Sequence, residues 1–337
     1  MLRINNRRYI GNKTKLLEQL SESIPNTFIP EQTVFADLFA GTGAVASYFA
    51  EKGFNVIVND ILYSNFVAYN AWLSDLPFDE CKIVKILDLL NSIDYNAIEP
   101  NYFSEIYSNK YFSFNDAKKI GYTRDYIESI RNSITEREYF ILLSSLLYAT
   151  DRIANTVGHF EYFLKKVPQD TFFKLENLEI KNIKHARLFN TDANCLAKQI
   201  RADIVYIDPP YNARQYINFY HVLENLARWQ KPREFEGNSM KFKRNELKSG
   251  YSRAEAPQLF ESLIESLDSK LILVSYSNTY SAKSIASNNK ISEEQIIGIL
   301  SRRGTVTKRE IDYDYFNAGK TNLEGHKELI FICEVCQ

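Results

Sequence analysis

The sequence has no long apolar stretch and almost no net charge. The longest apolar run, Ile141 to Ala149, is interrupted by two serines and is too short to span a bilayer. The first eight residues include three arginines and contain no apolar segment of the kind found in a signal peptide. We therefore expect a cytoplasmic protein with no membrane partner. The chain of 337 residues is 45% hydrophobic and 25% charged, which is typical of one large folded domain, or of one domain with a second inserted into it.

Cysteine and histidine are scarce, with four of each. The cysteines are Cys81, Cys195, Cys333 and Cys336, and the last two form a Cys-x-x-Cys pair that could suggest a zinc or redox site. This pair lies at the end of a predicted strand, where residues three apart point to opposite faces, and no second pair completes a tetrahedral site. We therefore expect no metal site. No Ser–His or Cys–His arrangement is evident, so the sequence does not indicate covalent catalysis.

The formal net charge of −1 does not favour a chain that binds polyanions over its whole surface. Positive charge is instead concentrated between Arg228 and Arg253, where eight Lys or Arg residues stand against three Glu. Glycines and serines in this segment favour a mobile loop. Three aromatic residues lie among its charges: Phe235, Phe242 and Tyr251. The residues that we expect to contact a polyanion are Lys241, Lys243, Arg244 and, upstream, Arg214. The alternative is a solvated surface loop.

Strand patterns occur towards both ends of the chain. The predicted strands are Thr33 to Leu38, Phe54 to Val58, Asp203 to Ile207, Lys270 to Tyr276, Thr305 to Tyr313 and Glu328 to Val335. A predicted helix, Ala44 to Lys52, joins the first two strands, which predicts a parallel sheet with a right-handed crossover. We expect the last two strands to pair as an antiparallel hairpin that closes the sheet.

The spacing of apolar residues is helical from Ile61 to Lys184. Helices are predicted at Cys81 to Leu90, Tyr122 to Asn132 and Glu136 to Thr150. The simplest architecture is an α/β sheet interrupted by a helical insertion.

A glycine-containing turn follows the first predicted strand, at Asp37 to Gly43. Glycines between a strand and a helix let the backbone approach a ligand closely. The next strand ends at Asp60, 19 residues beyond Gly41, where a carboxylate could accept hydrogen bonds from both ribose hydroxyls. The turn lacks the third glycine of a dinucleotide fingerprint and the Gly-Lys-Ser/Thr of a P-loop. It indicates an adenosine-containing cofactor, and the alternative is a tight turn without a ligand.

A second motif, Asp208-Pro209-Pro210-Tyr211, follows an apolar strand at the place where α/β enzymes bind ligands. The two prolines leave no backbone donors, so a target amine would meet only acceptors, the Asp208 carboxylate and the Pro209 carbonyl. Tyr211 offers a flat face on which a base can stack, a role that depends on the ring more than on the hydroxyl. Two acceptors that grip an amine favour a pyramidal nitrogen and stabilise the positive charge that develops on it. The motif therefore suits methyl transfer to an exocyclic base amine.

In three places, taken in order, the sequence resembles the group-alpha (Dam-like) N6-adenine-specific DNA methyltransferases. These are Tyr9 to Lys13, Phe39 to Gly43 and Asp208 to Tyr211. Three further stretches are similar to a restriction–modification branch of that family: Ala154 to Gly158, Phe163 to Lys165 and Tyr206 to Tyr220. The resemblance covers nearly the whole chain.

The resemblance implies S-adenosylmethionine as cofactor and assigns residues to it. Tyr9 and Lys13 would contact the methionine part, with Lys13 near its carboxylate. The residues that would line the rest of the cofactor are Asp37, Phe39, Ala40, Gly41, Thr42, Gly43, Asp60, Ile61, Asp192 and Asp208. Among them, Asp60 would hold the ribose, and Asp192 would accept a hydrogen bond from the adenine amine. Ser275 to Asn278 lies where the family has a motif that supports the target-base pocket.

The implied fold is a Rossmann-like S-adenosylmethionine-dependent methyltransferase, mostly parallel with a closing antiparallel hairpin. Residues 1–61 and 186–337 would form the catalytic domain, and residues 62–185 an inserted, mainly helical target-recognition domain. The implied substrate is double-stranded DNA, from which the target adenine is flipped. We expect a monomer. The insertion does not match the recognition hairpin of well-known family members, so the target site and the existence of a cognate restriction endonuclease stay open.

Three other readings compete with a DNA adenine methyltransferase. The nearest is methylation of cytosine N4 or of an RNA base amine, because related tetrapeptides serve such targets. A non-catalytic nucleic-acid-binding protein is disfavoured by the intact Asp208 and the intact glycines. An NAD-dependent oxidoreductase is disfavoured by the missing third glycine and by the Asp-Pro-Pro-Tyr loop.

Overall fold

A computed structural model describes residues 1–11, 13–171, 173–181, 183, 185–279, 288–312 and 327–336. Two residues named in the sequence analysis lie outside these ranges. They are Tyr313, the predicted end of a strand, and Asn12 of the N-terminal motif. The chain divides into two compact units. The helical unit comprises Met1–Gly11, Leu62–Lys184 and Ile217–Asn245, and the sheet unit comprises Asn12–Ile61, His185–Tyr216 and Glu246–Gln337. Within the described ranges, no helix is both long enough and apolar enough to cross a bilayer.

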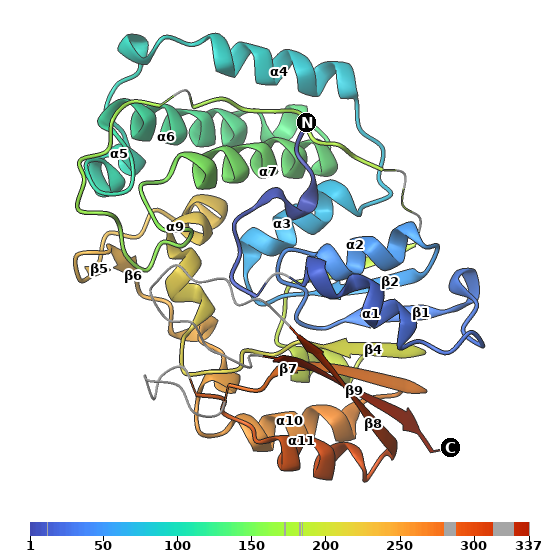
Figure 1. Ribbon diagram of the computed structural model, residues 1–337. Coiled ribbons are helices and arrows are strands. Elements are labelled where there is room, and N and C mark those ends of the chain that lie inside the picture. The colour runs from blue at the N-terminus through green and yellow to red at the C-terminus, as the bar shows by residue number, and fades with distance from the viewer. Residues whose placement is uncertain are drawn as a thin grey trace. The chain divides into compact units, whose positions relative to one another are not determined.

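The sheet unit is built on a seven-stranded sheet with the order β3-β2-β1-β4-β7-β9-β8 (Figure 1). The strands are β1 (Val34–Asp37), β2 (Asn55–Asn59), β3 (Ala186–Phe189), β4 (Ile204–Ile207), β7 (Leu271–Ser277), β8 (Gly304–Asp312) and β9 (Lys327–Val335). Strands β3, β2, β1, β4 and β7 pair in parallel, and β9 pairs antiparallel with both β7 and β8. This is the mostly parallel α/β sheet expected from the sequence, including its closing antiparallel hairpin.

Helices pack on both faces of this sheet. They are α1 (Leu17–Glu22), α2 (Ala44–Glu51), α8 (Ala193–Ala197), α10 (Ala256–Ser266) and α11 (Glu293–Leu300). Alternate residues of each buried strand point to opposite faces. Ala36 therefore belongs to the core formed with α8, α10 and α11, whereas Phe35 stacks on Phe49 of α2 with a centroid distance of 4.1 Å. Burial on both faces explains why these strands are continuously apolar.

The helical unit contains α3 (Tyr63–Trp72), α4 (Glu80–Ser92), α5 (Tyr102–Tyr107), α6 (Phe114–Ser129), α7 (Glu136–Ile153), α9 (Tyr216–Arg228) and the short hairpin of β5 (Phe235–Glu236) and β6 (Lys241–Phe242). Helix α7 packs against α3, α4 and α6. Its start is defined by Thr135, whose side chain accepts the Glu138 amide while Glu138 reaches back to the Thr135 amide. The predicted helix at Tyr122 to Asn132 proves to begin at Phe114, where Ser113 is the N-cap.

Buried charges connect α9 to the rest of the helical unit. Glu224 is fully buried and accepts the amides of Tyr63 and Ser64 at 2.8 and 2.9 Å, so it caps α3. Arg124 is 1% exposed, and its guanidinium donates to the Leu226 and Ala227 carbonyls at 2.9 and 3.3 Å. These bonds satisfy carbonyls at the end of α9 that have no partner within the helix.

Close packing of β8 on β9 makes Gly304 sensitive to substitution. A Cβ atom at Gly304 would lie 1.8 Å from the Glu334 carbonyl oxygen, so the two strands would have to separate. We expect Gly304→Ala to lower the free energy of unfolding by about 1–3 kcal/mol, the usual cost of overpacking. The matched control is Gly298→Ala in α11, where no atom lies within 4 Å of the new Cβ. This control should raise stability by up to about 1 kcal/mol. Denaturant titration measures both, and equal midpoints for Gly304→Ala and the parent would contradict the prediction.

Candidate active site

The glycine turn lies at the carboxyl end of β1 and leads directly into α2. Gly41 and Gly43 have φ values of +53° and +79°, in the left-handed region that side chains disfavour. Gly43 is the N-cap of α2, and its amide donates to the Ala40 carbonyl at 2.7 Å. These two glycines therefore produce a tight turn whose backbone is not screened by side chains.

The neighbouring strand ends are tied to this turn. The Asp60 carboxylate, 8% exposed after β2, accepts the Gly41 amide at 2.9 Å. The Asn190 side chain donates to the Asp60 carbonyl at 2.8 Å, which joins the loop after β3 to the same edge of the sheet. Asp192 is exposed and caps α8 by accepting the Cys195 amide at 3.0 Å. The structure thus brings the turn, Asp60 and Asp192 to the carboxyl edge of the parallel strands.

Asp37, the last residue of β1, is a buried acid. It is 1% exposed, and no side chain of the described residues donates to its carboxylate. Burial, reinforced by the negative charges of Asp208 and Asp60, raises the pKa of Asp37 well above its usual range, and the backbone amides of Phe39 and Ala46 oppose this rise. A carboxylate buried without a side-chain donor favours either a proton or a cationic ligand.

The Asp-Pro-Pro-Tyr loop follows β4, the strand next to β1. The Tyr211 carbonyl accepts the Tyr276 hydroxyl at 3.2 Å and the Lys290 amide at 2.8 Å. The Tyr211 ring also lies against the Tyr276 ring, with centroids 4.5 Å apart. On β7, Ser275 accepts the Tyr206 hydroxyl at 2.9 Å. Residues of β7 thus contact the loop and the strand before it, and a role of Ser275 to Asn278 in supporting the target-base pocket stays a prediction.

Four side chains of the sheet unit meet beside this loop: Lys13, Asp208, Tyr211 and Glu328. The Lys13 ammonium lies 3.3 Å from Asp208 Oδ1, donates to the Tyr211 hydroxyl at 2.5 Å and forms an ion pair with Glu328. The Tyr211 hydroxyl lies 2.5 Å from Asp208 Oδ1 and 2.5 Å from Glu328 Oε1. The side chains of Lys13 and Glu328 are 8% and 4% exposed, so the pair is shielded from water.

The electrostatics of this cluster follow from burial and from two carboxylates sharing one ammonium. Burial raises the pKa of Asp208 to about 6, Glu328 adds to this rise, and Lys13 opposes it. Burial alone would lower the pKa of Lys13, but Asp208 and Glu328 raise it above its usual range. Burial and the Asp208 charge raise the pKa of Tyr211 well above its usual range, so the phenol stays neutral. Asp208 therefore titrates closer to neutral pH than an ordinary aspartate.

The cluster adds two details to the sequence-based expectations. The Lys13 ammonium is engaged by Asp208, Tyr211 and Glu328, and its assignment to the cofactor's carboxylate stays a prediction. The Tyr211 hydroxyl is a hydrogen-bonding member of the cluster, in addition to the ring that was expected to matter more. Glu328 was not identified from sequence. The signal was an acid at the start of an apolar strand, at a position that shares one face of the strand with Ile330 and Ile332.

Tyr9 lies in the helical unit. Its ring stacks on Tyr220 with centroids 4.6 Å apart and planes 3° apart, and Arg7 lies over both rings. The amide of Ile10 donates to the Tyr220 hydroxyl at 2.7 Å. The assignment of Tyr9 to the cofactor stays a prediction.

The basic segment Arg228 to Arg253 has more structure than a mobile loop, and it is divided between the two units after Asn245. Phe242 and Tyr251, expected among the exposed charges, are 7% and 2% exposed and pack inside their units, because large aromatic rings gain most from burial. Arg244 is 6% exposed, and its guanidinium binds Glu236, the Asn218 side chain and the Phe242 carbonyl at 2.8–2.9 Å.

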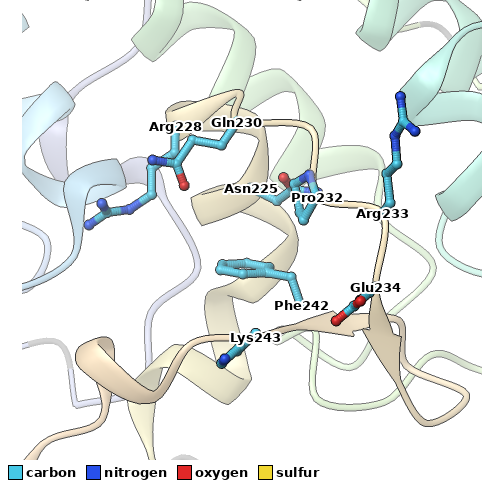
Figure 2. Close-up of a pocket in the computed structure, with 8 residues that line it drawn as sticks. All are labelled: Asn225, Arg228, Gln230, Pro232, Arg233, Glu234, Phe242 and Lys243. Atoms are coloured by element: carbon cyan, nitrogen blue, oxygen red, sulfur yellow. The ribbon is translucent and has the colours of Figure 1, made fainter.

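The other basic residues of the expected contact set are more accessible. Lys241 is partly buried beside Tyr162, whereas Lys243 and Arg214 are exposed. Lys243 lines a cavity of about 320 Å³ together with Asn225, Arg228, Gln230, Pro232, Arg233, Glu234 and Phe242. Figure 2 shows the guanidinium groups of Arg228 and Arg233 pointing away from Phe242 in different directions. The positive charges of the residues that line the cavity therefore do not converge on one point.

The chain is similar to known proteins over most of its length. Residues 9–297 match the model of the D12 class N6 adenine-specific DNA methyltransferases. The chain is 35% identical to modification methylase StsI of Streptococcus sanguinis and 36% identical to modification methylase LlaI of Lactococcus lactis subsp. lactis, over 96% and 80% of its length. It spans 50% and 46% of those two proteins. It is also 32% identical to type II methyltransferase M.NlaIII of Neisseria lactamica, over 95% of both chains.

The match covers the glycine turn, the Asp-Pro-Pro-Tyr loop and most of the helical unit, and the relatives are similar over most of this chain. The chain therefore belongs to the D12 class of N6 adenine-specific DNA methyltransferases.

Proposed function

We propose that the chain transfers a methyl group from S-adenosylmethionine to adenine N6 within a specific sequence of double-stranded DNA. The observation that carries this proposal is the Asp208 carboxylate, held by Lys13 and Tyr211 at the carboxyl end of β4. The names of the relatives, modification methylases and type II methyltransferases, support a role in restriction–modification. A cognate endonuclease is part of this proposal, as is target recognition by the helical unit.

S-adenosylmethionine, when bound, supplies an electrophilic methyl group on a sulfonium. The residues of the sheet unit fit such a cofactor in two ways. Asp37 is a buried carboxylate to which no described side chain donates, which suits a cationic ligand. The turn from Phe39 to Gly43 presents backbone at the start of α2. In this proposal, Asp60 holds the ribose and Asp192 accepts the adenine amine.

The acceptors of the Asp-Pro-Pro-Tyr loop then act on the target amine. Asp208 and the Pro209 carbonyl each accept one amine hydrogen, which favours a pyramidal N6 with its lone pair directed away from them. As the new C–N bond forms, ionised Asp208 stabilises the positive charge on N6. After transfer, the N6 cation gives up one amine proton to Asp208 or to water, so Asp208 need not be a strong base. The ring of Tyr211 supplies a surface for the flipped base.

Methylation-aware sequencing of DNA from cells that express the protein tests the proposal. We expect N6-methyladenine in one short sequence context, and its absence from cells that express Asp208→Ala. N4-methylcytosine in place of N6-methyladenine, or methylation confined to RNA, would instead favour the nearest competing reading.

We further propose that Lys241 and Lys243 contact DNA phosphates. Replacing both with Ala should weaken duplex binding and flatten its salt dependence by up to about 0.9 in log–log slope per lost contact, because fewer counterions are released. Cofactor binding should be unchanged. Fluorescence anisotropy with labelled duplex at several salt concentrations measures the slope.

Arg244→Ala serves as a matched control, because Arg244 follows Lys243 directly in the chain but is buried. We expect it to lower the stability of the helical unit and to leave the salt slope unchanged. Equal affinity and slope for the Lys241/Lys243 double variant and the parent would mean that the hairpin is only a solvated surface.

A further inference from the structure

Glu328 is a buried acid that the proposed reaction does not by itself require. It lies near the start of β9, opposite Ser277 of β7 and Ile311 of β8, and is 3% exposed. A carboxylate at a buried strand position is costly unless cations or donors engage it. Lys13 and Tyr211 engage it here.

The contacts of Glu328 coincide with those of Asp208. The two groups that approach Asp208 Oδ1 are the Lys13 ammonium, at 3.3 Å, and the Tyr211 hydroxyl, at 2.5 Å. Both also contact Glu328 Oε1. Asp208 Oδ2 accepts no hydrogen bond from the part of the chain that the structure describes. One oxygen of Asp208 is thus anchored, and the other is available to an amine.

A simple structural ion pair does not account for this arrangement. One carboxylate would neutralise Lys13, and a second adds uncompensated negative charge to a buried site. The arrangement is better explained if the second carboxylate orients the groups that hold the first.

We propose that Glu328 is a positioning residue for methyl transfer, which holds Lys13 and Tyr211 so that Asp208 is fixed through Oδ1 and presents Oδ2 to the target amine. This inference rests on the proposed function. It predicts that loss of Glu328 affects the methylation rate more than the binding of either substrate, because small misplacements of reacting groups are costly.

Single-turnover methylation of duplex DNA tests this inference with Glu328→Gln and Glu328→Ala. We expect rates lower by roughly 10-fold for Gln, which retains an acceptor oxygen, and by roughly 100-fold for Ala. The affinities for DNA and cofactor should stay within about threefold of the parent. Glu334→Gln is the control, because Glu334 lies on the same strand and is exposed. It should match the parent.

The pH dependence of the methylation rate distinguishes a positioning role from a packing role, because loss of packing alone would not shift it. Asp208 must be ionised to accept the amine, so the parent rate should fall as the pH drops through about 6. The groups that face Asp208 are Lys13, Glu328, Tyr211, Asp37 and Tyr206. Glu328→Gln removes a like charge, which lowers the pKa of Asp208. The acid limb of the rate profile should therefore move to lower pH by roughly one unit. Carbon-13 NMR of aspartate-labelled protein without cofactor measures the same shift, with Asp208→Asn identifying the signal.

These measurements distinguish a failure of the inference about Glu328 from a failure of the proposed function. An active parent whose rate and acid limb are unchanged in Glu328→Gln would overturn the inference. So would rate losses that parallel losses of thermal stability. A parent that methylates no adenine would overturn the proposed function instead, while the NMR titration would still test whether Glu328 controls Asp208. If Glu328→Ala does not fold, the results for Glu328→Gln alone test the inference.

Discussion

Asp208→Ala is expected to lower the single-turnover rate of adenine methylation by at least roughly 100- to 1000-fold. The substitution removes the carboxylate that, in the proposed mechanism, accepts the target amine and stabilises its developing positive charge. It leaves Lys13 paired with Glu328, so the cluster keeps a neutral ion pair. Quenched-flow methylation with enzyme in excess over DNA measures the rate, and calorimetry should show cofactor affinity within about threefold of the parent.

Three further variants show whether the effect is specific. Asp268→Ala removes a carboxylate that is 64% exposed in the same unit, and we expect the parent rate. Tyr211→Phe keeps the ring but removes the hydroxyl beside Asp208 Oδ1, so it should lose part of the activity, and Tyr211→Ala should lose more. Full single-turnover activity in Asp208→Ala would exclude the proposed mechanism.

Gly43→Val is expected to weaken cofactor binding by at least about 100-fold, which corresponds to roughly 2.7 kcal/mol. Gly43 has a φ of +79°, where a β-branched side chain is strained. It is also the N-cap of α2, so the added side chain would screen the backbone that the proposal assigns to the ligand. Isothermal calorimetry with S-adenosylmethionine measures the affinity.

Gly53→Val separates strain from ligand contact. Gly53 lies beyond the other end of α2 and has a φ of +96°, so valine is strained there as well. We expect both variants to lose stability, but only Gly43→Val to lose cofactor affinity. Unchanged affinity in Gly43→Val would mean that the turn is structural and that the cofactor binds elsewhere.

Much of the sheet unit could be predicted, because its signals are local. The apolar runs after Thr33 and before Asp208, the turn glycines and the final pair of strands predicted an α/β sheet closed by a hairpin, and the structure has these elements. Strand β3 was not predicted. It has only four residues, includes the exposed Arg187, and forms the edge of the sheet by pairing with β2 alone. A short edge strand lacks the continuous apolar run that marks a buried one.

The charged segments were harder to interpret, because exposure depends on distant partners. Arg244 and Lys243 are adjacent and carry the same charge, yet the first is buried against Asn218 and Glu236 and the second is exposed. Likewise, the residues after the Asp-Pro-Pro-Tyr loop form α9, which belongs to the helical unit through Glu224 and Arg124.

The sequence alone determined the chemical class of this protein. Asp208 and the prolines after it, the turn glycines and Asp60 lie within a few residues of a strand end, so a local pattern was enough to indicate the family. Only the tertiary structure decided how Asp208 is held. Lys13 and Glu328 are 315 residues apart and become partners because strand β9 inserts beside β7, while the N-terminal segment supplies the ammonium. Pairing between charges so far apart depends on strand order and burial, which no local pattern records.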